Sequence, residues 1–340
     1  MIITATALTP QVLTLAQPWQ TARGILRERL GWVLAVQTDT GLEGFGEALP
    51  LVDAGTEDHT ACHTALERLA EVLKGMTPAE VFENLHELTP NCPAALCAAE
   101  TALLDVLAKS EALSPPQWLN TNAAQTVRVN ATAGALSMGL EEKMAQYMAE
   151  GFTVIKLKVG LDDSASEARE LAVLCSHLAP GVSLRLDANG AWNAEQAATF
   201  LAGVADLPIE SLEEPLAEPD FTILKQLQDQ TPFSLALDES LWRMGPEAVF
   251  SSCPTKRVVL KPMAAGGPAS TYRLGRLAQE AGLETVVTTT IDGRIGTWAA
   301  IHAAAALDEQ KKWTHGLSTG AWIKENNDLL PSDSAEISAF

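Results

Sequence analysis

Five charged residues recur at a nearly constant interval in the second half of this 340-residue chain, and each one closes a short apolar run. They are Lys158, Asp187, Glu213, Asp238 and Lys261, and successive members lie 23 to 29 residues apart. That interval is close to the length of one strand with its following helix. Because the carboxyl ends of parallel strands meet at one face, where active sites lie, we expect the five side chains to gather there.

The three acidic residues of this set would converge on one point. Asp187, Glu213 and Asp238 repel one another unless a cation joins them. No Cys or His accompanies them, so the ligands suit a hard cation, and the sequence predicts Mg²⁺, or Mn²⁺ as a substitute. The alternative is a set of ion pairs with the lysines. Glu214 and Glu239 stand beside two predicted ligands, and by alternation they face away from the centre or lie in loops.

Two more features concern the lysines of the stretch VIKLKVG, residues 154–160. Lys156 and Lys158 share one side of this predicted strand, which is costly unless carboxylates lie opposite. A metal ion and a neutral amine together remove a proton from the carbon next to a carboxylate. Crowding by cations favours the neutral form of Lys158, so we predict that it is the base, with Lys261 on the other flank of the metal.

Two other functions would use part of this constellation. Schiff-base aldol chemistry also needs a barrel lysine, but it needs no carboxylate trio. A binding protein without catalytic activity on the same scaffold is a further alternative.

The elements that carry these residues are predicted from an alternation of apolar runs and amphipathic stretches after residue 125. Eight strands with helices between them favour a parallel (β/α) barrel, and an open doubly wound sheet is the alternative. Neither GxGxxG after a predicted strand nor GxxxxGK[ST] occurs, so no nucleotide fingerprint is present. The predicted strands cover residues 126–133, 153–160, 182–190, 209–215, 233–240, 257–262, 284–290 and 312–319.

The first part of the chain has a mixed α+β pattern. Two apolar runs around Asp-Thr-Gly within residues 28–49 predict a β-hairpin. Helical patterns follow at 56–75, 78–88 and 93–111, and the last has a proline near its start. The polar stretch 114–126 predicts a linker to the barrel.

Composition limits the partners of the chain. A formal net charge of −20 disfavours binding to nucleic acid or to an anionic membrane. No run of about 18 apolar residues predicts a membrane span, and the first 20 residues lack the pattern of a signal peptide. Five scattered cysteines without CxxC spacing fit a reduced, cytoplasmic protein. We expect a small-molecule carboxylate as the substrate, and the oligomeric state stays open.

Several short motifs resemble those of the enolase superfamily, in its muconate-lactonising-enzyme-like subgroup. They are KLK (156–158), LDAN (186–189), LEEP (212–215), LDES (237–240) and LKP (260–262), with GFGEALP (44–50) in the expected place of the first part. The resemblance implies an α/β fold, a (β/α)7β TIM-like barrel with an α+β capping domain. It places the cap at residues 1–123, the catalytic barrel at 124–320, and a returning tail at 321–340.

The resemblance also implies roles for the constellation. Asp187, Glu213 and Asp238 would bind Mg²⁺, and Lys158 and Lys261 would lie on opposite faces of the substrate. Within the superfamily, the stretches TTIDGRIGTWAAIHAAAAL (289–307) and THGLSTGAW (314–322) resemble those of o-succinylbenzoate synthases. These lyases form o-succinylbenzoate in menaquinone or phylloquinone biosynthesis.

Further roles follow from the same resemblance. Lys158 would take the proton and then protonate the departing hydroxyl, Lys261 would stabilise the negative charge, and Lys156 would tune Lys158. Asn189 and Arg185 would support the metal ligands, for which packing roles are the alternative. Backbone N–H groups near Thr289 and Gly316 would hold the succinyl carboxylate. Asp292 departs from the pattern, because many members have Glu there.

The main alternative is an isomerase on the same scaffold. N-succinylamino acid racemases share all five charged residues, and dipeptide epimerases usually show DxD after the last strand, where this chain has HGLSTG. A mandelate-racemase-type base would be a His on the seventh strand, and ETVVTTT has none. His315 and His302 are expected to be structural, and Trp192 follows a ligand motif. The cap stretches 17–24 and 51–60 are expected over the barrel mouth.

Overall fold

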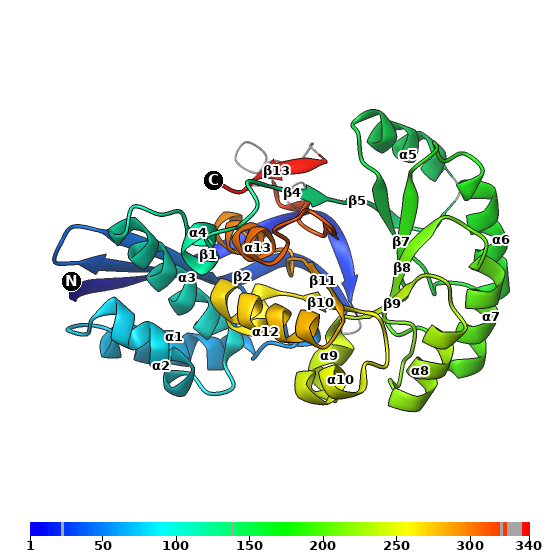
Figure 1. Cartoon of the computed structure of the whole chain (residues 1–340). Coiled ribbons are helices and arrows are strands. Elements are labelled where there is room, and N and C mark those ends of the chain that lie inside the picture. Colours follow the sequence, from blue (N-terminus) through cyan, green and yellow to red (C-terminus); the bar gives the residue numbers. More distant parts are fainter. Residues whose placement is uncertain (22–23, 138, 320–321, 325–334) are drawn as a thin grey trace.

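The fold is described from a computed structural model that covers residues 1–21, 24–137, 139–319, 322–324 and 335–340. It has an antiparallel sheet with helices at one end and a parallel barrel at the other, drawn at the left and right of Figure 1. Among the described residues, no helix is both long and apolar enough to cross a bilayer.

The capping sheet contains three antiparallel strands in the order β1-β2-β3. They are β1 (Ile3–Thr21), β2 (Gly24–Thr38) and β3 (Glu43–Ala48). The predicted hairpin is confirmed, since β2 and β3 pair up to Gln37 and Glu43. Most of the stretch 17–24 belongs to the paired ends of β1 and β2 rather than to a loop, and residues 22–23 lie outside the described chain.

The three predicted cap helices are also confirmed. They are α1 (His59–Val72), α2 (Pro78–Leu88) and α3 (Pro93–Ser110), and a short 3-10 helix η1 (Val52–Ala54) precedes them. Proline at the first position of α2 and α3 suits a helix start, since its missing N–H would be unpaired there. The predicted linker contains the additional helix α4 (Pro115–Leu119).

The barrel sheet runs in the order β5 to β11, and all neighbours among these seven strands are parallel. The last strand, β12, pairs in parallel with β4, and a bridge between Thr288 and Gly316 joins it to the end of β11. The eight-stranded (β/α)7β barrel is therefore confirmed. Its first strand is interrupted at Asn130 and consists of β4 (Thr126–Val129) and β5 (Ala131–Ala135). The other seven are β6 (Val154–Lys158), β7 (Ser183–Asp187), β8 (Ile209–Glu213), β9 (Ser234–Leu237), β10 (Arg257–Leu260), β11 (Glu284–Val287) and β12 (Thr314–His315).

Helices cover the outside of these strands, and α5 to α8 form the outer layer at the right of Figure 1. The helices between the strands are α5 (Leu140–Ala149), α6 (Ser164–Cys175), α7 (Ala194–Val204), α8 (Phe221–Asp229), α9 (Glu239–Met244), α10 (Pro246–Ser252), α11 (Pro262–Ala265), α12 (Pro268–Glu280) and α13 (Arg294–Leu307). The strand β13 (Glu336–Ser338) pairs antiparallel with β4.

Two buried apolar clusters stabilise the molecule, one inside the barrel layers and one in the cap. The cap cluster also contains Met263, Ile291 and Ile323, which come from the barrel side of the chain. Ile323 forms a bridge with Leu15 of β1, whereas residues 321 and 325–334 of the predicted returning tail lie outside the described chain. The proposed domain boundary after residue 123 stays a prediction.

Candidate active site at the barrel mouth

Strand register places four of the five spaced charges side by side. In the parallel ladders, Lys158 lies opposite Asp187, and Asp187 lies opposite Glu213. Glu213 pairs with Ala236, and Asp238 follows two residues later, directly after the end of β9. The interval seen in the sequence therefore gathers these side chains at the carboxyl ends of neighbouring strands.

Lys156 is held by two of these acids. Its Nζ atom lies 2.9 Å from Asp187 Oδ2 and also donates to Glu213 Oε2. Burial disfavours the ammonium, but the carboxylates of Asp187 and Glu213 outweigh it and raise the pKa of Lys156 above its ordinary value. Lys156 is thus a fixed cation between two predicted metal ligands.

Lys261 is held in a similar way from the opposite flank. Its Nζ atom lies 2.7 Å from Asp238 Oδ1 and 2.6 Å from Glu239 Oε1. Burial again opposes the charge, yet the two carboxylates raise the pKa of Lys261. Glu239 was expected to face away from the centre or to lie in a loop, and its position at the start of α9 brings it to Lys261 instead.

Lys158 differs from both of these lysines. In the part of the chain that the structure describes, its ammonium has no hydrogen-bond or ion-pair partner, although it lies next to Asp187 in the ladder. Of the three site lysines, it is the one whose nitrogen no carboxylate of the described residues holds.

The donor set is compatible with a divalent cation. Three carboxylates supply hard oxygen ligands, and the buried Asp238 Oδ1 has no hydrogen bond of acceptable geometry despite its nearby ammonium. Burial, and then Glu239, raise the pKa of Asp238 well above its ordinary value, although the ammonium groups of Lys261 and Lys156 oppose this shift. Across the described ranges, however, no group of three or more acidic, His or Cys side chains has an arrangement that could already hold a metal ion.

A buried carboxyl group supports the loop that carries Asp238. Glu214 accepts hydrogen bonds from the backbone N–H of Asp238 at 2.5 Å and from that of Ser240 at 2.9 Å. It also accepts from the Ser240 hydroxyl at 2.5 Å. Burial, and then Glu239, raise the pKa of Glu214 to about 7. Alternation predicted that Glu214 faces away from the centre or lies in a loop, and its contacts are with the loop that carries Asp238.

The two predicted supporting residues contact the acids in different ways. Asn189 has a φ of 46°, and its backbone N–H donates to Asp187 Oδ1 at 3.0 Å. Arg185 is buried, and its Nε atom lies 3.9 Å from Glu213 Oε1. It binds more closely to Glu210, at 3.1 Å, so it links Glu213 to a charged layer deeper in the barrel.

That deeper layer contains two arginines and two glutamates. Glu210 lies 2.5 Å from Arg257 Nη1, and Arg257 also contacts Glu284 at 2.9 Å. Burial would raise the pKa of Glu210, but Arg185 and Arg257 lower it to about 2. These ion pairs connect β7, β8, β10 and β11 beneath the site.

Hydroxyl groups line the ends of β11 and β12. The Oγ1 atoms of Thr289 and Thr319 lie 2.7 Å apart, and the Thr288 hydroxyl donates to the carbonyl of Gly316 at 2.8 Å. The backbone N–H of Gly316 itself donates to Val287 at 2.9 Å within the barrel. A substrate anion near this edge would therefore need other donors than the Gly316 N–H, such as the two threonine hydroxyls.

The two histidines and Trp192 have structural contacts. His315 is buried, accepts from the backbone N–H of Val287 at 3.1 Å, and has a pKa lowered by burial. Burial lowers the pKa of His302 in α13 to about 4. Trp192 packs on Phe200 with ring centroids 4.3 Å apart.

The cap reaches the site through the turn around Gly55. A Cβ atom on Gly55 would lie 3.0 Å from Trp242 Cδ1, and Trp242 belongs to α9, which begins directly after Asp238. The segment 51–60 therefore does approach the mouth.

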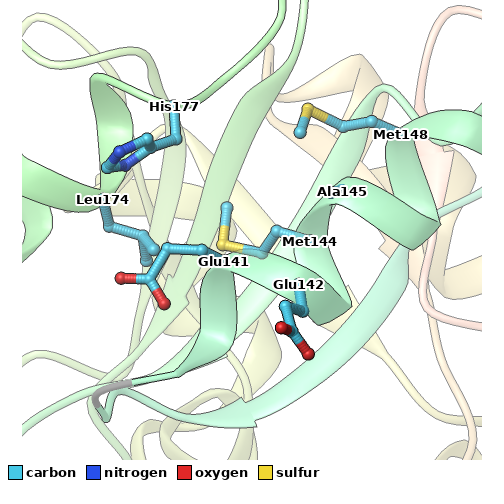
Figure 2. Close-up of a pocket in the computed structure, with 7 residues that line it drawn as sticks. All are labelled: Glu141, Glu142, Met144, Ala145, Met148, Leu174 and His177. Atoms are coloured by element: carbon cyan, nitrogen blue, oxygen red, sulfur yellow. The ribbon is translucent and has the colours of Figure 1, made fainter.

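A separate cavity of about 360 Å³ lies on the outside of the barrel, between α5 and the end of α6 (Figure 2). None of the site residues contributes to it. Its lining is mostly apolar and comprises Glu141, Glu142, Met144, Ala145, Met148, Leu174 and His177.

Comparison with known proteins identifies both parts of the chain. Residues 139–332 match the family described as enolase C-terminal domain-like. Residues 2–119 match the mandelate racemase / muconate lactonizing enzyme N-terminal domain.

Individual relatives have different activities. The chain is 29% identical over 306 residues to the L-Ala-D/L-Glu epimerase of Bacillus subtilis, which covers 86% of this chain and 82% of that protein. It is 26% identical over 357 residues to the o-succinylbenzoate synthase of Desulfotalea psychrophila, with 95% and 94% covered. A dipeptide epimerase structure from Methylococcus capsulatus, complexed with Mg and the dipeptide L-Arg-D-Lys, superposes with a TM-score of 0.86 at 26% identity and covers 100% of this chain and 98% of that one.

The matched domains agree with the barrel and its cap. They also agree with the ring of acids and lysines at the barrel mouth, which consists of Lys156, Lys158, Asp187, Glu213, Asp238 and Lys261. The chain is an enzyme of the enolase superfamily and belongs to its muconate-lactonising-enzyme-like subgroup.

Proposed function

We propose that the chain is a Mg²⁺-dependent lyase that dehydrates 2-succinyl-6-hydroxy-2,4-cyclohexadiene-1-carboxylate to o-succinylbenzoate. The observation that carries this proposal is the asymmetry of the two flanking lysines. Lys158 has no partner among the described residues, whereas Lys261 is held by Asp238 and Glu239 at 2.7 and 2.6 Å. A dehydration needs one residue that moves a proton, while inversion of a stereocentre needs one on each face.

The three acids are the residues that would hold Mg²⁺. Asp187, Glu213 and Asp238 supply its oxygen ligands, and Mn²⁺ would be a substitute. When bound, the cation neutralises the negative charge that develops on the substrate carboxylate as the neighbouring proton leaves.

Lys158 and Lys261 would carry out the remaining steps. The neutral Lys158 amine takes the proton from the carbon next to the carboxylate. The same ammonium then gives that proton to the departing hydroxyl, so water leaves and the ring becomes aromatic. Lys261 stays an ammonium and stabilises the developing negative charge from the opposite face. Lys156 keeps Asp187 and Glu213 in place.

The second candidate is an epimerase or racemase, including the N-succinylamino acid and dipeptide classes. It is favoured by the 29% identity to the Bacillus subtilis epimerase, which is higher than that to the o-succinylbenzoate synthase. Against a dipeptide, the stretch HGLSTG contains no acid to bind a substrate ammonium. The hydroxyls of Thr289 and Thr319 instead suit a carboxylate or carbonyl oxygen.

An ultraviolet assay of the purified chain on the cyclohexadiene carboxylate tests this proposal. It is run with Mg²⁺ and then with excess EDTA, while polarimetry follows N-succinylamino acids and L,L-dipeptides in parallel. Mg²⁺-dependent dehydration that exceeds any inversion by 100-fold or more, roughly the discrimination that a few kcal/mol provides, supports the lyase. Inversion without dehydration overturns it in favour of an isomerase.

A further inference from the structure

Outside the ring of acids and lysines, three ionisable side chains are buried together where the cap meets the barrel. Arg29 of β2, Glu47 of β3 and Asp292 after β11 are each at most 2% exposed. Buried charges destabilise a fold unless they are paired. The contacts of these three side chains therefore show which segments of the chain they join.

Arg29 binds carbonyl groups on both sides of this junction. It donates to the carbonyl oxygens of Leu49 at 2.6 Å and Pro50 at 3.0 Å in the cap. On the barrel side it donates to the carbonyl of Ile291 at 3.3 Å and faces the Thr290 hydroxyl at 3.4 Å. One guanidinium therefore ties β2 and the end of β3 to the segment after β11.

Glu47 binds the next residues of the same segment. Its Oε1 atom accepts from the backbone N–H of Gly293 at 2.6 Å, directly before α13. A Cβ atom on Gly293 would overlap the Glu47 carboxyl group, and one on Gly296 would lie 2.8 Å from it. Glycine at these two positions makes room for a carboxyl group that comes from the cap.

The segment held in this way is strained. Ile291 is β-branched and has a φ of 61°, a conformation that is unfavourable for such a residue and persists only when its surroundings enforce it. The same turn fixes Thr289, whose Oγ1 atom accepts from the Ile291 N–H at 3.3 Å and contacts Thr319 at the site.

We propose that Arg29 and Glu47 are positioning residues of the cap that hold residues 289–293 so that the Thr289 hydroxyl faces the substrate. This rests on the proposed function, in which Thr289 binds the carboxylate or carbonyl of the substrate. Neither residue touches the reacting atoms, since both act through the backbone of the strained segment.

The contact of Arg29 and Glu47 with residues 289–293 depends on a proton, because the cluster contains two acids and one arginine. Burial, and then Asp292, raise the pKa of Glu47 to about 8, and burial also raises the pKa of Asp292. The other groups that face the pair are Arg29 from β2, the Cys97 thiol from α3 and, toward Asp292, Lys261 directly after β10. While either Glu47 or Asp292 keeps its proton, the charge of the other is balanced by Arg29. When both are ionised, the cluster contains one buried negative charge in excess.

The direction of the pH effect follows from the raised pKa. The folded state keeps the Glu47 proton between about pH 4.5 and 8, where the unfolded chain has lost it, so the hold weakens as pH rises through this range. Glu47→Gln keeps an acceptor for the Gly293 N–H without an ionisable group. Glu47→Gln should therefore still hold residues 289–293 in place, and this contact should not weaken at alkaline pH.

Hydrogen–deuterium exchange of a peptide that covers residues 289–293 tests the proposal without any substrate. Wild type, Glu47→Gln, Glu47→Ala and the matched control Glu43→Gln, on the exposed edge of the same strand, are compared at pH 6 and pH 9. We expect Glu47→Ala to exchange at least about 10-fold faster at pH 6. Wild type and Glu43→Gln should lose protection at pH 9, and Glu47→Gln should not.

A KM and kcat comparison at both pH values completes the test. We expect Glu47→Ala to raise the KM for the cyclohexadiene carboxylate about 10-fold or more with a smaller change in kcat, and Glu47→Gln to rescue it. Wild-type protection in Glu47→Ala, equal pH dependence in wild type and Glu47→Gln, or an unchanged KM in Glu47→Ala would each overturn the proposal. If wild type turned over no cyclohexadiene carboxylate, the proposed function would fail, while hydrogen exchange would still decide whether Arg29 and Glu47 hold the segment.

Discussion

At the scale of single residues, the three site lysines differ in what they contact. Lys156 and Lys261 each touch two carboxylates, whereas Lys158 touches none among the described residues. Alternation along one strand predicted that Lys156 and Lys158 share a side, but it could not show which of them the acids hold. In the ladder Lys156 lies opposite Arg185 and Lys158 lies opposite Asp187, so the contacts of Lys156 with Asp187 and Glu213 depend on the length of its side chain and not on the register.

The predicted metal ligand Asp238 can be distinguished from its neighbour Glu239. Asp238→Asn removes a carboxylate of the proposed Mg²⁺ site, and we expect the Mg²⁺ affinity to fall by about 100-fold or more. Glu239→Gln removes a partner of Lys261 but no proposed ligand, so the affinity should change by less than about 10-fold. Isothermal titration of both variants with Mg²⁺ measures this difference. A larger loss of Mg²⁺ affinity in Glu239→Gln than in Asp238→Asn would mean that Glu239, and not Asp238, is the metal ligand.

At the scale of elements, close packing of α3 on β3 depends on two glycines. A Cβ atom on Gly44 or Gly46 would overlap the backbone oxygen of Ala102 or Ala98 in α3. The motif GFGEALP placed this strand by resemblance, but its glycines have a packing reason that no periodicity reveals.

Gly46→Ala should therefore destabilise the fold strongly, because backbone atoms must move apart. We expect the free energy of unfolding to fall by about 3 kcal/mol or more, as for an overpacked core. Phe45→Ala is the matched control, because Phe45 is 41% exposed on the other face of β3. Urea unfolding compares the two variants, and equal losses would refute the packing argument.

The charged layer beneath the site gives a pH prediction for the barrel strands. Glu210 has a pKa near 2 in the folded state, below its ordinary value of 4.5, so its stabilisation is complete above pH 4.5 and is lost as pH falls toward 2. The difference corresponds to about 3 kcal/mol. Urea unfolding between pH 7 and 3 should show about 2 kcal/mol of this loss in wild type and in Glu195→Gln, an exposed control in α7, but less of it in Glu210→Gln. A parallel pH dependence in all three proteins would contradict it.

Most elements could be predicted from the sequence because apolar runs and caps are local signals. The barrel strands and the helices α1 to α3 follow from such patterns. The break at Asn130 between β4 and β5 could not, since it depends on pairing with β12 and β13 at one end and with β6 at the other. The short helix α4 was missed because its polar composition resembles a linker.

At the scale of the whole molecule, cap and barrel share a core. Met263 and Ile291 are buried in the cap cluster although they follow barrel strands, and Arg29 binds across the same junction. Sequence patterns predict two units but contain no direct sign of this shared surface. For the same reason Arg29 and Glu47 were absent from the predicted site, because their partners are distant in the chain. Glu239 was absent because alternation along the strand placed it away from the centre or in a loop.

This shared core predicts that cap and barrel unfold together. We expect one calorimetric transition, with equal calorimetric and van't Hoff enthalpies, in wild type. Met263→Ala should lower the transition temperature without splitting it, since the loss of a buried Met costs about 2–5 kcal/mol. Two resolved transitions in wild type would show that the units are independent.

The central claim is that Lys158 moves the proton in a Mg²⁺-dependent dehydration. Its most direct measurement is the dehydration rate of wild type and Lys158→Ala on the cyclohexadiene carboxylate, with Mg²⁺ binding titrated on the same samples. We predict that Lys158→Ala loses at least about 10³-fold in kcat while its Mg²⁺ affinity stays within about 10-fold of wild type. Substantial dehydration by Lys158→Ala, or wild-type turnover that persists in excess EDTA, would contradict the claim.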